Sequence, residues 1–164
     1  TTGLAIQGTR FTYALGRLAL WSPEPGYVDA EGRVLSEAAF RHLAIANPVL
    51  APYGQAAREA LQALGQWDRL RSRLVMGENV GQAFQYVTSG NAELGLLAWS
   101  QLPREGAWPA GSWWLLPENL HQPIAQQAVM LKDSAASRAF LDFLGSAEGV
   151  AIIRRHGYGI ADDL

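Results

Sequence analysis

The chain has 164 residues, of which 49% are hydrophobic and 17% charged, and its formal net charge is −2. These values are typical of one packed globular domain or of two small lobes, and they exclude a disordered segment. The slight negative charge gives no indication of binding to nucleic acid or to an anionic membrane. The sequence contains no cysteine, which excludes disulfides, thiolate metal sites and cysteine nucleophiles.

No apolar run approaches the ~20 residues that a helix needs to span a bilayer, so we expect no membrane-spanning segment. The first residues lack the basic region that opens a secretory signal peptide, so none is expected within these residues.

Residues 10–22 alternate between two faces, which predicts one or two consecutive strands with a bend at Gly16. Ser36 is expected to cap a short helix that runs to His42. A short apolar stretch at 43–46 then predicts a buried strand.

Two turns, at residues 47–54 and 76–81, each lie between an apolar strand and a segment with helical periodicity. The first helix is expected to begin near Tyr53 and the second near Val80. The apolar run at 93–99 reads as a further strand. The order strand, helix, strand, helix, strand predicts a parallel sheet with right-handed crossovers.

These two helix starts are candidate anion-binding groups. The first N–H groups of a helix have no partner within it, and they lie at the positive end of the helix dipole. Two such starts that face one crevice would bind an anion without any lysine or arginine. The alternative is that both are ordinary turns of an α/β domain that bind nothing. Spacing alone leaves both interpretations open.

Residues 103–117 are rich in Trp, Gly and Pro and are expected to cover the sheet edge as an irregular loop. The tryptophans of this loop and its neighbourhood are more typical of a hydrophobic cover than of a base-stacking surface, because no basic residues are interleaved with them. They are Trp108, Trp113 and Trp114.

The C-terminal part predicts a strand at 124–132 and two helices, capped by Ser134 and Ser146. The second helix is expected to end at Gly157. The residues expected to face inward are Ala136, Phe140, Phe143 and Leu144 on the first helix and Val150 and Ile153 on the second.

Nothing in the sequence indicates catalysis or a cation site. The three histidines, His42, His121 and His156, show no metal-ligand spacing, and no nucleophile elbow or P-loop is present. Glu78 is the one acid/base candidate near the two turns, and its place before a helix cap favours a solvated side chain. We therefore expect no enzyme activity and no cofactor.

Four stretches occur in order along the chain: RFTYALGRLALWS at 10–22, IANPVLAPYGQAAREALQALGQWDRL at 45–70, ENVGQAFQYVTSGNAELGLLAWSQL at 78–102, and QQAVMLKDSAASRAFLDFLGSAEGVAIIRRHGYGI at 126–160. Together they resemble the periplasmic molybdate-binding proteins (ModA) of ABC importers. The resemblance covers nearly the whole chain, but the first third of the family pattern is absent.

The resemblance implies an α/β fold of the type II periplasmic-binding-protein class, with two lobes whose mainly parallel central sheets are flanked by helices. Residues 1–15 and 125–164 would be the remnant of an incomplete first lobe, together with the crossover strands. Residues 16–124 would be a complete second lobe.

The resemblance also implies which residues bind the oxyanion. Tyr53 matches the position where one branch of the family uses a tyrosine, and Val80 matches a position whose backbone N–H reaches the anion. Ala98 stands where another branch of the family places its tyrosine. The combination of Tyr53 and Ala98 therefore matches the first branch. A phenol remains protonated at neutral pH and donates to an oxyanion. The loop backbone at Gly54 and Asn79 is a further candidate; no catalytic residues and no direct cation ligands are implied.

The function implied is that of the periplasmic substrate-binding component of a molybdate or tungstate ABC importer, with the membrane permease as partner. The alternatives are a ligand-sensing or regulatory domain of the same fold and a binder of another oxyanion such as sulfate. Because both proposed donors lie on the second lobe, the isolated chain is expected to bind molybdate weakly. It is also expected to associate through uncovered apolar surfaces.

Overall fold

The computed structural model describes residues 4–105 and 108–161. The chain forms two compact units. Unit 1 consists of the residues up to Gly16 and those from Ala125 onward, and unit 2 is Arg17–Ile124. In the described residues, no helix is long and apolar enough to cross a bilayer.

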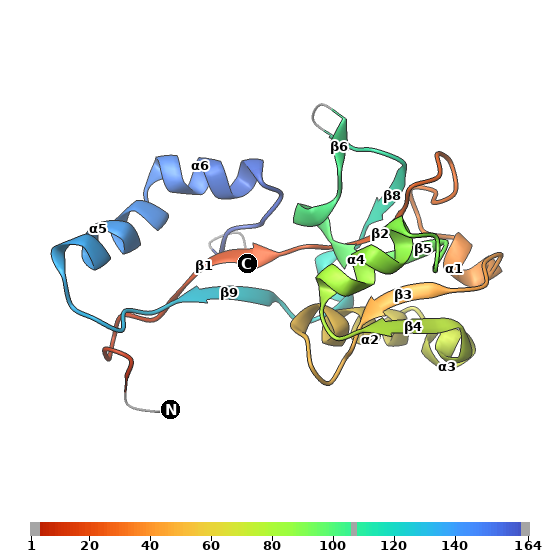
Figure 1. Ribbon diagram of the computed structural model, residues 1–164, viewed down its shortest axis with the longest axis horizontal. Coiled ribbons are helices and arrows are strands. Elements are labelled where there is room, and N and C mark those ends of the chain that lie inside the picture. Colours follow the sequence, from red (N-terminus) through yellow and green to blue (C-terminus); the bar gives the residue numbers. More distant parts are fainter. Residues whose placement is uncertain (1–3, 106–107, 162–164) are drawn as a thin grey trace. The chain divides into compact units, whose positions relative to one another are not determined.

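Unit 2 contains a five-stranded sheet with the strand order β4-β3-β5-β2-β8 (Figure 1). Its strands are β2 (Leu18–Ser22), β3 (Leu43–Ala46), β4 (Leu74–Gly77), β5 (Leu94–Ala98) and β8 (Ser112–Leu115); β6 (Arg104–Glu105) and β7 (Trp108–Pro109) form a separate hairpin. Its α-helices are α1 (Val34–Glu37), α2 (Pro52–Ala63), α3 (Trp67–Leu70) and α4 (Val80–Thr88), and its 3-10 turns are Arg71–Arg73, Trp99–Gln101 and Glu118–Leu120.

The sheet is mixed. Strand β3 is parallel to both β4 and β5, whereas β2 is antiparallel to both β5 and β8. The predicted order of three strands and two helices is confirmed as β3, α2, β4, α4 and β5, and its strands are the parallel part of the sheet. The α/β class is thus confirmed, with antiparallel pairing at the other end of the sheet.

The two long helices of unit 2 cover opposite faces of this sheet. Side chains of a strand alternate between its faces. In β2, Leu18 and Leu20 belong to the core that contains α2, whereas Ala19 and Trp21 belong to the core that contains α4. Both cores are dominated by aliphatic and small residues that are almost fully buried. The sheet therefore lies between the packed faces of α2 and α4.

The prediction of an irregular loop over residues 103–117 is wrong in part, because β8 lies within it and forms the sheet edge beside β2. A strand inside a sheet needs hydrogen-bonding partners on both sides, and β8 supplies them to β2. Trp114 consequently packs on the α2 core and Trp113 on the α4 core. Trp108 stacks on Trp113 but remains 62% exposed.

The prediction of a helix capped by Ser36 is also wrong. Ser36 lies within α1, and its hydroxyl donates to the carbonyl oxygen of Arg33 at 2.8 Å. The helix ends after Glu37 because Ala38 adopts the left-handed conformation, with φ at 51°. Residues 38–42 are therefore not helical.

Unit 1 has a small core. Strand β1 (Phe11–Gly16) pairs with β9 (Ile124–Ala128), and the helices are α5 (Ala135–Leu144) and α6 (Ala147–Arg155). The predicted caps are confirmed, since the hydroxyls of Ser134 and Ser146 accept hydrogen bonds from the first turns of these helices. The buried cluster consists of Ala14, Ile153 and Ile160, with Tyr13, Val150 and Tyr158 packed against it.

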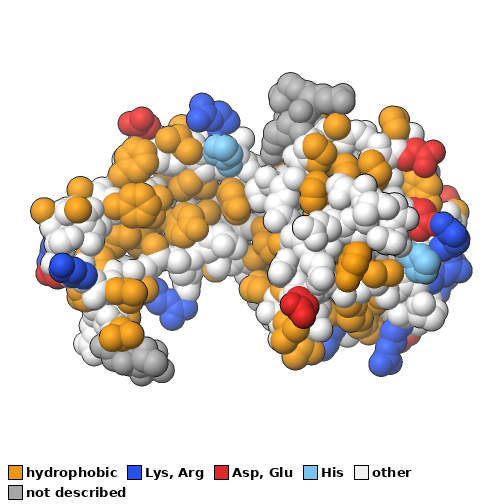
Figure 2. Space-filling model, in the orientation of Figure 1, with side chains coloured by type: hydrophobic (Ala, Val, Ile, Leu, Met, Phe, Trp, Pro, Cys, Tyr) orange, Lys and Arg blue, Asp and Glu red, His pale blue; other side chains and the backbone are white. Residues whose placement is uncertain are grey.

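The prediction that α5 buries an apolar face is wrong for the described residues. No residue of α5 is buried, and Phe140 is 59% and Phe143 39% exposed. The core of unit 1 gathers around α6 and the end of β1, which leaves α5 without a covering element in the described part of the unit. Figure 2 shows hydrophobic side chains gathered over α5 and α6.

Candidate functional site

The two predicted turns lie next to each other at one edge of the sheet. Strands β3 and β4 are parallel neighbours, and Ala46 lies opposite Gly77. One residue further on, the backbone N–H of Asn47 donates to the carbonyl oxygen of Gly77 at 2.7 Å. The chain then leaves β3 towards α2 on one face and leaves β4 towards α4 on the other. Open α/β sheets bind ligands where neighbouring strands send their connections to opposite faces.

The first turn is fixed by Asn47. Its side-chain oxygen accepts a hydrogen bond from the Val49 N–H at 2.9 Å, and its carbonyl oxygen accepts from the N–H groups of Leu50 and Ala51. Pro52 then occupies the first helical position, which suits its fixed φ. This local bonding gives the start of α2 a defined direction.

Gly54 lets the first turn of α2 lie directly against the end of β3. A Cβ atom at this position would lie 2.4 Å from the carbonyl oxygen of Ala46 and 2.5 Å from the carbonyl carbon of Asn47. No side chain fits in that space, because both neighbours are backbone atoms that cannot turn away. The close approach of helix and strand therefore depends on glycine at position 54.

The second turn is closed by two hydrogen bonds from backbone N–H groups to side chains. The side-chain oxygen of Asn79 accepts from the Gln82 N–H at 3.0 Å, and the side-chain oxygen of Gln82 accepts from the Glu78 N–H at 2.7 Å. The start of this helix near Val80 was predicted, whereas the capping role of Gln82 was missed. The spacing of Asn79 and Gln82 is that of a capping box and could have revealed it. The N–H groups of Val80 and Gly81 come next and have no acceptor within the helix.

The structure therefore brings together the two turns that carry the predicted ligand residues. Tyr53 is half-buried and its ring packs against the α2 core. Gly54 is buried, Val80 is half-buried and Asn79 is exposed. The direct contacts of these residues with an anion stay a prediction. Apart from Glu78, the two turns contain no charged residue, so the donors available there are neutral.

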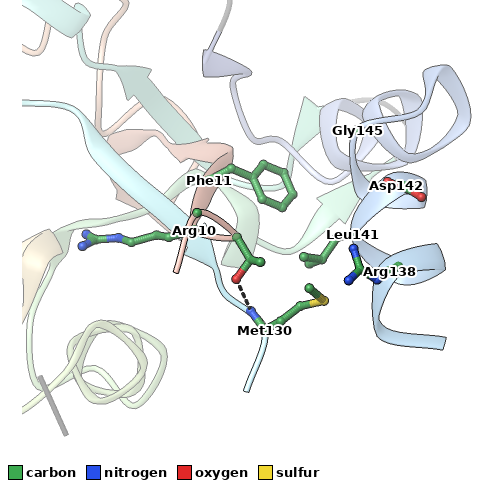
Figure 3. Close-up of a pocket in the computed structure, with 9 residues that line it drawn as sticks. Arg10, Phe11, Met130, Arg138, Leu141, Asp142 and Gly145 are labelled. Atoms are coloured by element: carbon green, nitrogen blue, oxygen red, sulfur yellow. Dashed lines mark hydrogen bonds between the residues drawn. The ribbon is translucent and has the colours of Figure 1, made fainter. Parts of the chain in front are cut away.

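A cavity of about 530 Å³ lies within unit 1 and contains none of the predicted residues. Arg10 and Arg138 line it, together with Phe11, Met130 and Leu141 (Figure 3). Both arginines are already engaged, Arg10 with the Gln127 side chain and Arg138 with the carboxylate of Asp133. Figure 3 shows the Arg10 side chain directed away from the other labelled side chains. The Arg138 guanidinium is therefore paired with a carboxylate, whereas the Arg10 guanidinium bonds a neutral amide.

In the described part of the chain, no group of three or more His, Asp or Glu side chains is placed to hold a metal ion. The chemistry that the two turns can provide is the donation of hydrogen bonds from backbone N–H groups and neutral side chains.

Comparison with known proteins identifies a family and several similar relatives. Residues 1–159 match the family described as bacterial extracellular solute-binding protein. The chain is 47% identical over 161 residues to the molybdate-binding protein ModA of Azotobacter vinelandii, which covers 96% of this chain and 64% of the relative. It is 46% identical over 160 residues to the ModA of Rhodobacter capsulatus, covering 95% of this chain and 62% of that protein.

The fold is also similar to a solved structure, the periplasmic molybdate-binding protein of Azotobacter vinelandii. The TM-score is 0.87 at 41% sequence identity, over 96% of this chain and 71% of that structure. The chain spans less than two thirds of the length of both ModA relatives.

Proposed function

The chain belongs to the bacterial extracellular solute-binding protein family, and we propose that it is a molybdate- or tungstate-binding component of an ABC importer. The observation that carries this proposal is the position of the two helix starts. They leave neighbouring parallel strands towards opposite faces of the sheet and are joined by the bond from Asn47 to Gly77. The similarity to the two ModA relatives supports molybdate as the ligand.

The neutral character of the two turns fits an anion that stays fully ionised. Molybdate carries two negative charges at neutral pH and can only accept hydrogen bonds. A site built from N–H groups and a phenol donates to every oxygen, and it disfavours a protonated anion, whose own donor would face a donor. In this proposal Tyr53 donates through its hydroxyl and Val80 through its backbone N–H, and the backbone at Gly54 and Asn79 completes this side of the site.

The same proposal covers the remaining parts of the function. The protein would act in the periplasm, like the periplasmic molybdate-binding protein of Azotobacter vinelandii. It would deliver its ligand to a membrane permease and would carry out no chemical reaction. Unit 2 would be a complete lobe and unit 1 a part of the other lobe. The similarity to solute-binding relatives is the support for these statements.

An NMR titration of the 164-residue chain with sodium molybdate tests the proposal. Because amide shifts report binding even when it is weak, we expect the amide signals of Tyr53, Gly54, Val80 and Gly81 to move and to saturate. Signals from α5 and α6 should stay in place. Sodium sulfate and sodium perchlorate at the same ionic strength are the controls. Equal shifts with all three salts, or none at the two turns, would contradict molybdate binding there; larger shifts with sulfate would favour a sulfate binder.

A further inference from the structure

The segment that leads from unit 2 into β9 lies along one side of helix α2. Gln122, Pro123 and Ile124 border a small cavity of about 80 Å³ together with Pro52, Gln55, Ala56 and Glu59. These four residues of α2 follow the spacing i, i+3, i+4 and i+7, so they form one stripe that begins at the first turn of the helix. Ile124 is buried in the same core as Ala56. The segment therefore supports the side of α2 on which the helix begins.

Glu59 links this helix to the segment through hydrogen bonds. One carboxylate oxygen accepts a hydrogen bond from the Gln122 backbone N–H at 2.8 Å, and the other accepts from the side-chain amide of Gln55 at 2.9 Å. The backbone bond from Gln122 lowers the pKa of Glu59 below its usual value, with smaller contributions from the Gln55 side chain, His121 and Arg58. Hydrogen bonds to an ionised acceptor are stronger than neutral ones.

We propose that Glu59 is a positioning residue for the candidate oxyanion site: it holds the first two turns of α2 against the segment Gln122–Ile124 and so fixes where Tyr53 and Gly54 present their donors. This inference rests on the proposed function, since it concerns the same site. Glu59 itself is not expected to touch the anion, because it lies six residues beyond Tyr53 along the helix.

The hydrogen bond between Glu59 and Gln122 lies close to the boundary between the two units in the sequence. Unit 2 ends at Ile124, two residues after the N–H group that Glu59 binds. Glu59 therefore connects the helix that opens at the candidate site with the point where the chain passes into unit 1. Ligand binding that orders the first turn of α2 should consequently also protect the Gln122 amide.

Glu93 offers a matched control within the same unit. Its carboxylate also accepts one backbone N–H, that of His42 at 2.9 Å, and one side-chain donor, the Arg41 guanidinium at 2.9 Å. His42 directly precedes β3, so this bond lies at the opposite end of β3 from the turn at Asn47. Loss of the Glu93 carboxylate is therefore expected to lower the stability of the fold without moving Tyr53 or Gly54.

The test uses the 164-residue chain with Glu59→Ala, Glu59→Gln and Glu93→Gln. We expect Glu59→Ala to move the Tyr53 and Gly54 amide signals without any ligand, to speed hydrogen exchange of the Gln122 amide, and to weaken molybdate binding roughly three- to tenfold. Glu59→Gln keeps an acceptor oxygen and should rescue most of each effect. Glu93→Gln should leave all three readouts as in the parent chain while lowering the melting temperature.

The readouts separate this inference from the proposed function. If the parent chain binds no molybdate, the proposed function fails, and the Tyr53 and Gly54 signals without ligand still decide the role of Glu59. The inference is overturned if Glu59→Ala leaves those two signals and the Gln122 exchange rate unchanged. It is also overturned if Glu93→Gln changes them as much, since a general loss of stability would then explain the effect.

Discussion

The backbone N–H of Asn47 donates a 2.7 Å hydrogen bond to the carbonyl oxygen of Gly77, and this bond joins two turns that are thirty residues apart in the sequence. It extends the parallel pairing of β3 and β4 by one step beyond the last paired residues. The starts of α2 and α4 therefore leave the sheet from adjacent points.

Removing the Tyr53 hydroxyl should weaken molybdate binding. Tyr53→Phe is expected to lower the binding free energy by about 1.5–3 kcal/mol, the range for a hydrogen bond to a charged group. The fold should change little, because the ring that packs on the α2 core remains. Titration calorimetry or the NMR titration measures the effect. A Phe variant that binds like the parent would show that the phenol serves packing alone.

Substitutions of Val80 should distinguish a backbone donor from a side-chain contact. Val80→Ala keeps the N–H group and should change molybdate affinity little. Val80→Pro deletes that donor and should reduce affinity severely, although proline is tolerated at the first position of a helix. The same titrations compare the two variants, and circular dichroism checks that α4 persists. Equal losses in both would rule out the backbone N–H as the donor.

A carboxylate at the N-cap of α4 should preserve or raise the stability of the fold and lower its affinity for molybdate. Asn79→Asp keeps the capping oxygen and adds a charge that suits the helix dipole, so the melting temperature should hold or rise. The same charge repels an oxyanion at the helix start, and affinity should fall about tenfold. Ser146→Asp is the matched control, since Ser146 caps α6 in unit 1 through the Gly149 N–H at 3.1 Å. It should leave molybdate affinity unchanged.

Protonation of Glu93 at low pH should lower the stability of the fold. Partial burial raises the pKa of Glu93, but the bonds from the Arg41 guanidinium and the His42 N–H outweigh it and lower the pKa from 4.5 to about 2. A carboxyl with a lower pKa in the folded state stabilises the fold above the unfolded value. This contribution is therefore complete above pH 4.5 and is lost as the pH falls towards 2.

Urea unfolding at several pH values between 2 and 6 measures this loss. Glu93→Gln should be less stable than the parent at pH 6, and the difference between the two should shrink as the pH falls. A difference that stays constant over this range would contradict the role assigned to the ionised carboxylate.

The exposed apolar residues of unit 1 should cause self-association. Phe140 is 59% and Leu131 66% exposed, and Phe143 and Val129 are each 39% exposed. Val129, Leu131 and Phe140 line one cavity, and exposed apolar surface that gathers in this way associates in water. Light scattering should show a mass above that of one chain, rising with concentration. The double variant Leu131→Ser and Phe140→Ser should lower it, whereas a parent chain that stays monomeric at all concentrations would contradict the prediction.

The sequence by itself determined the local elements of this protein. Helix starts at Val80, Ala135 and Ala147 could be read from Asn79, Ser134 and Ser146, because a capping side chain bonds to an N–H only two or three residues away. The buried strands could be read from short apolar runs such as 43–46. The neutral composition of the two turns, and with it the kind of ligand they suit, was also present in the residue types alone.

Only the tertiary structure decided which elements meet. The pairing of β8 with β2 turned part of a predicted loop into a sheet edge, since a strand acquires partners from distant parts of the chain. The exposure of α5 followed from the absence of a covering element in the described part of unit 1, although its pattern of phenylalanines is that of a buried face. The bond from Gln122 to Glu59 spans 63 residues and left no local signal. Capping and periodicity act over a few residues and are written in the sequence, whereas pairing, burial and long-range hydrogen bonds depend on which surfaces fold against each other.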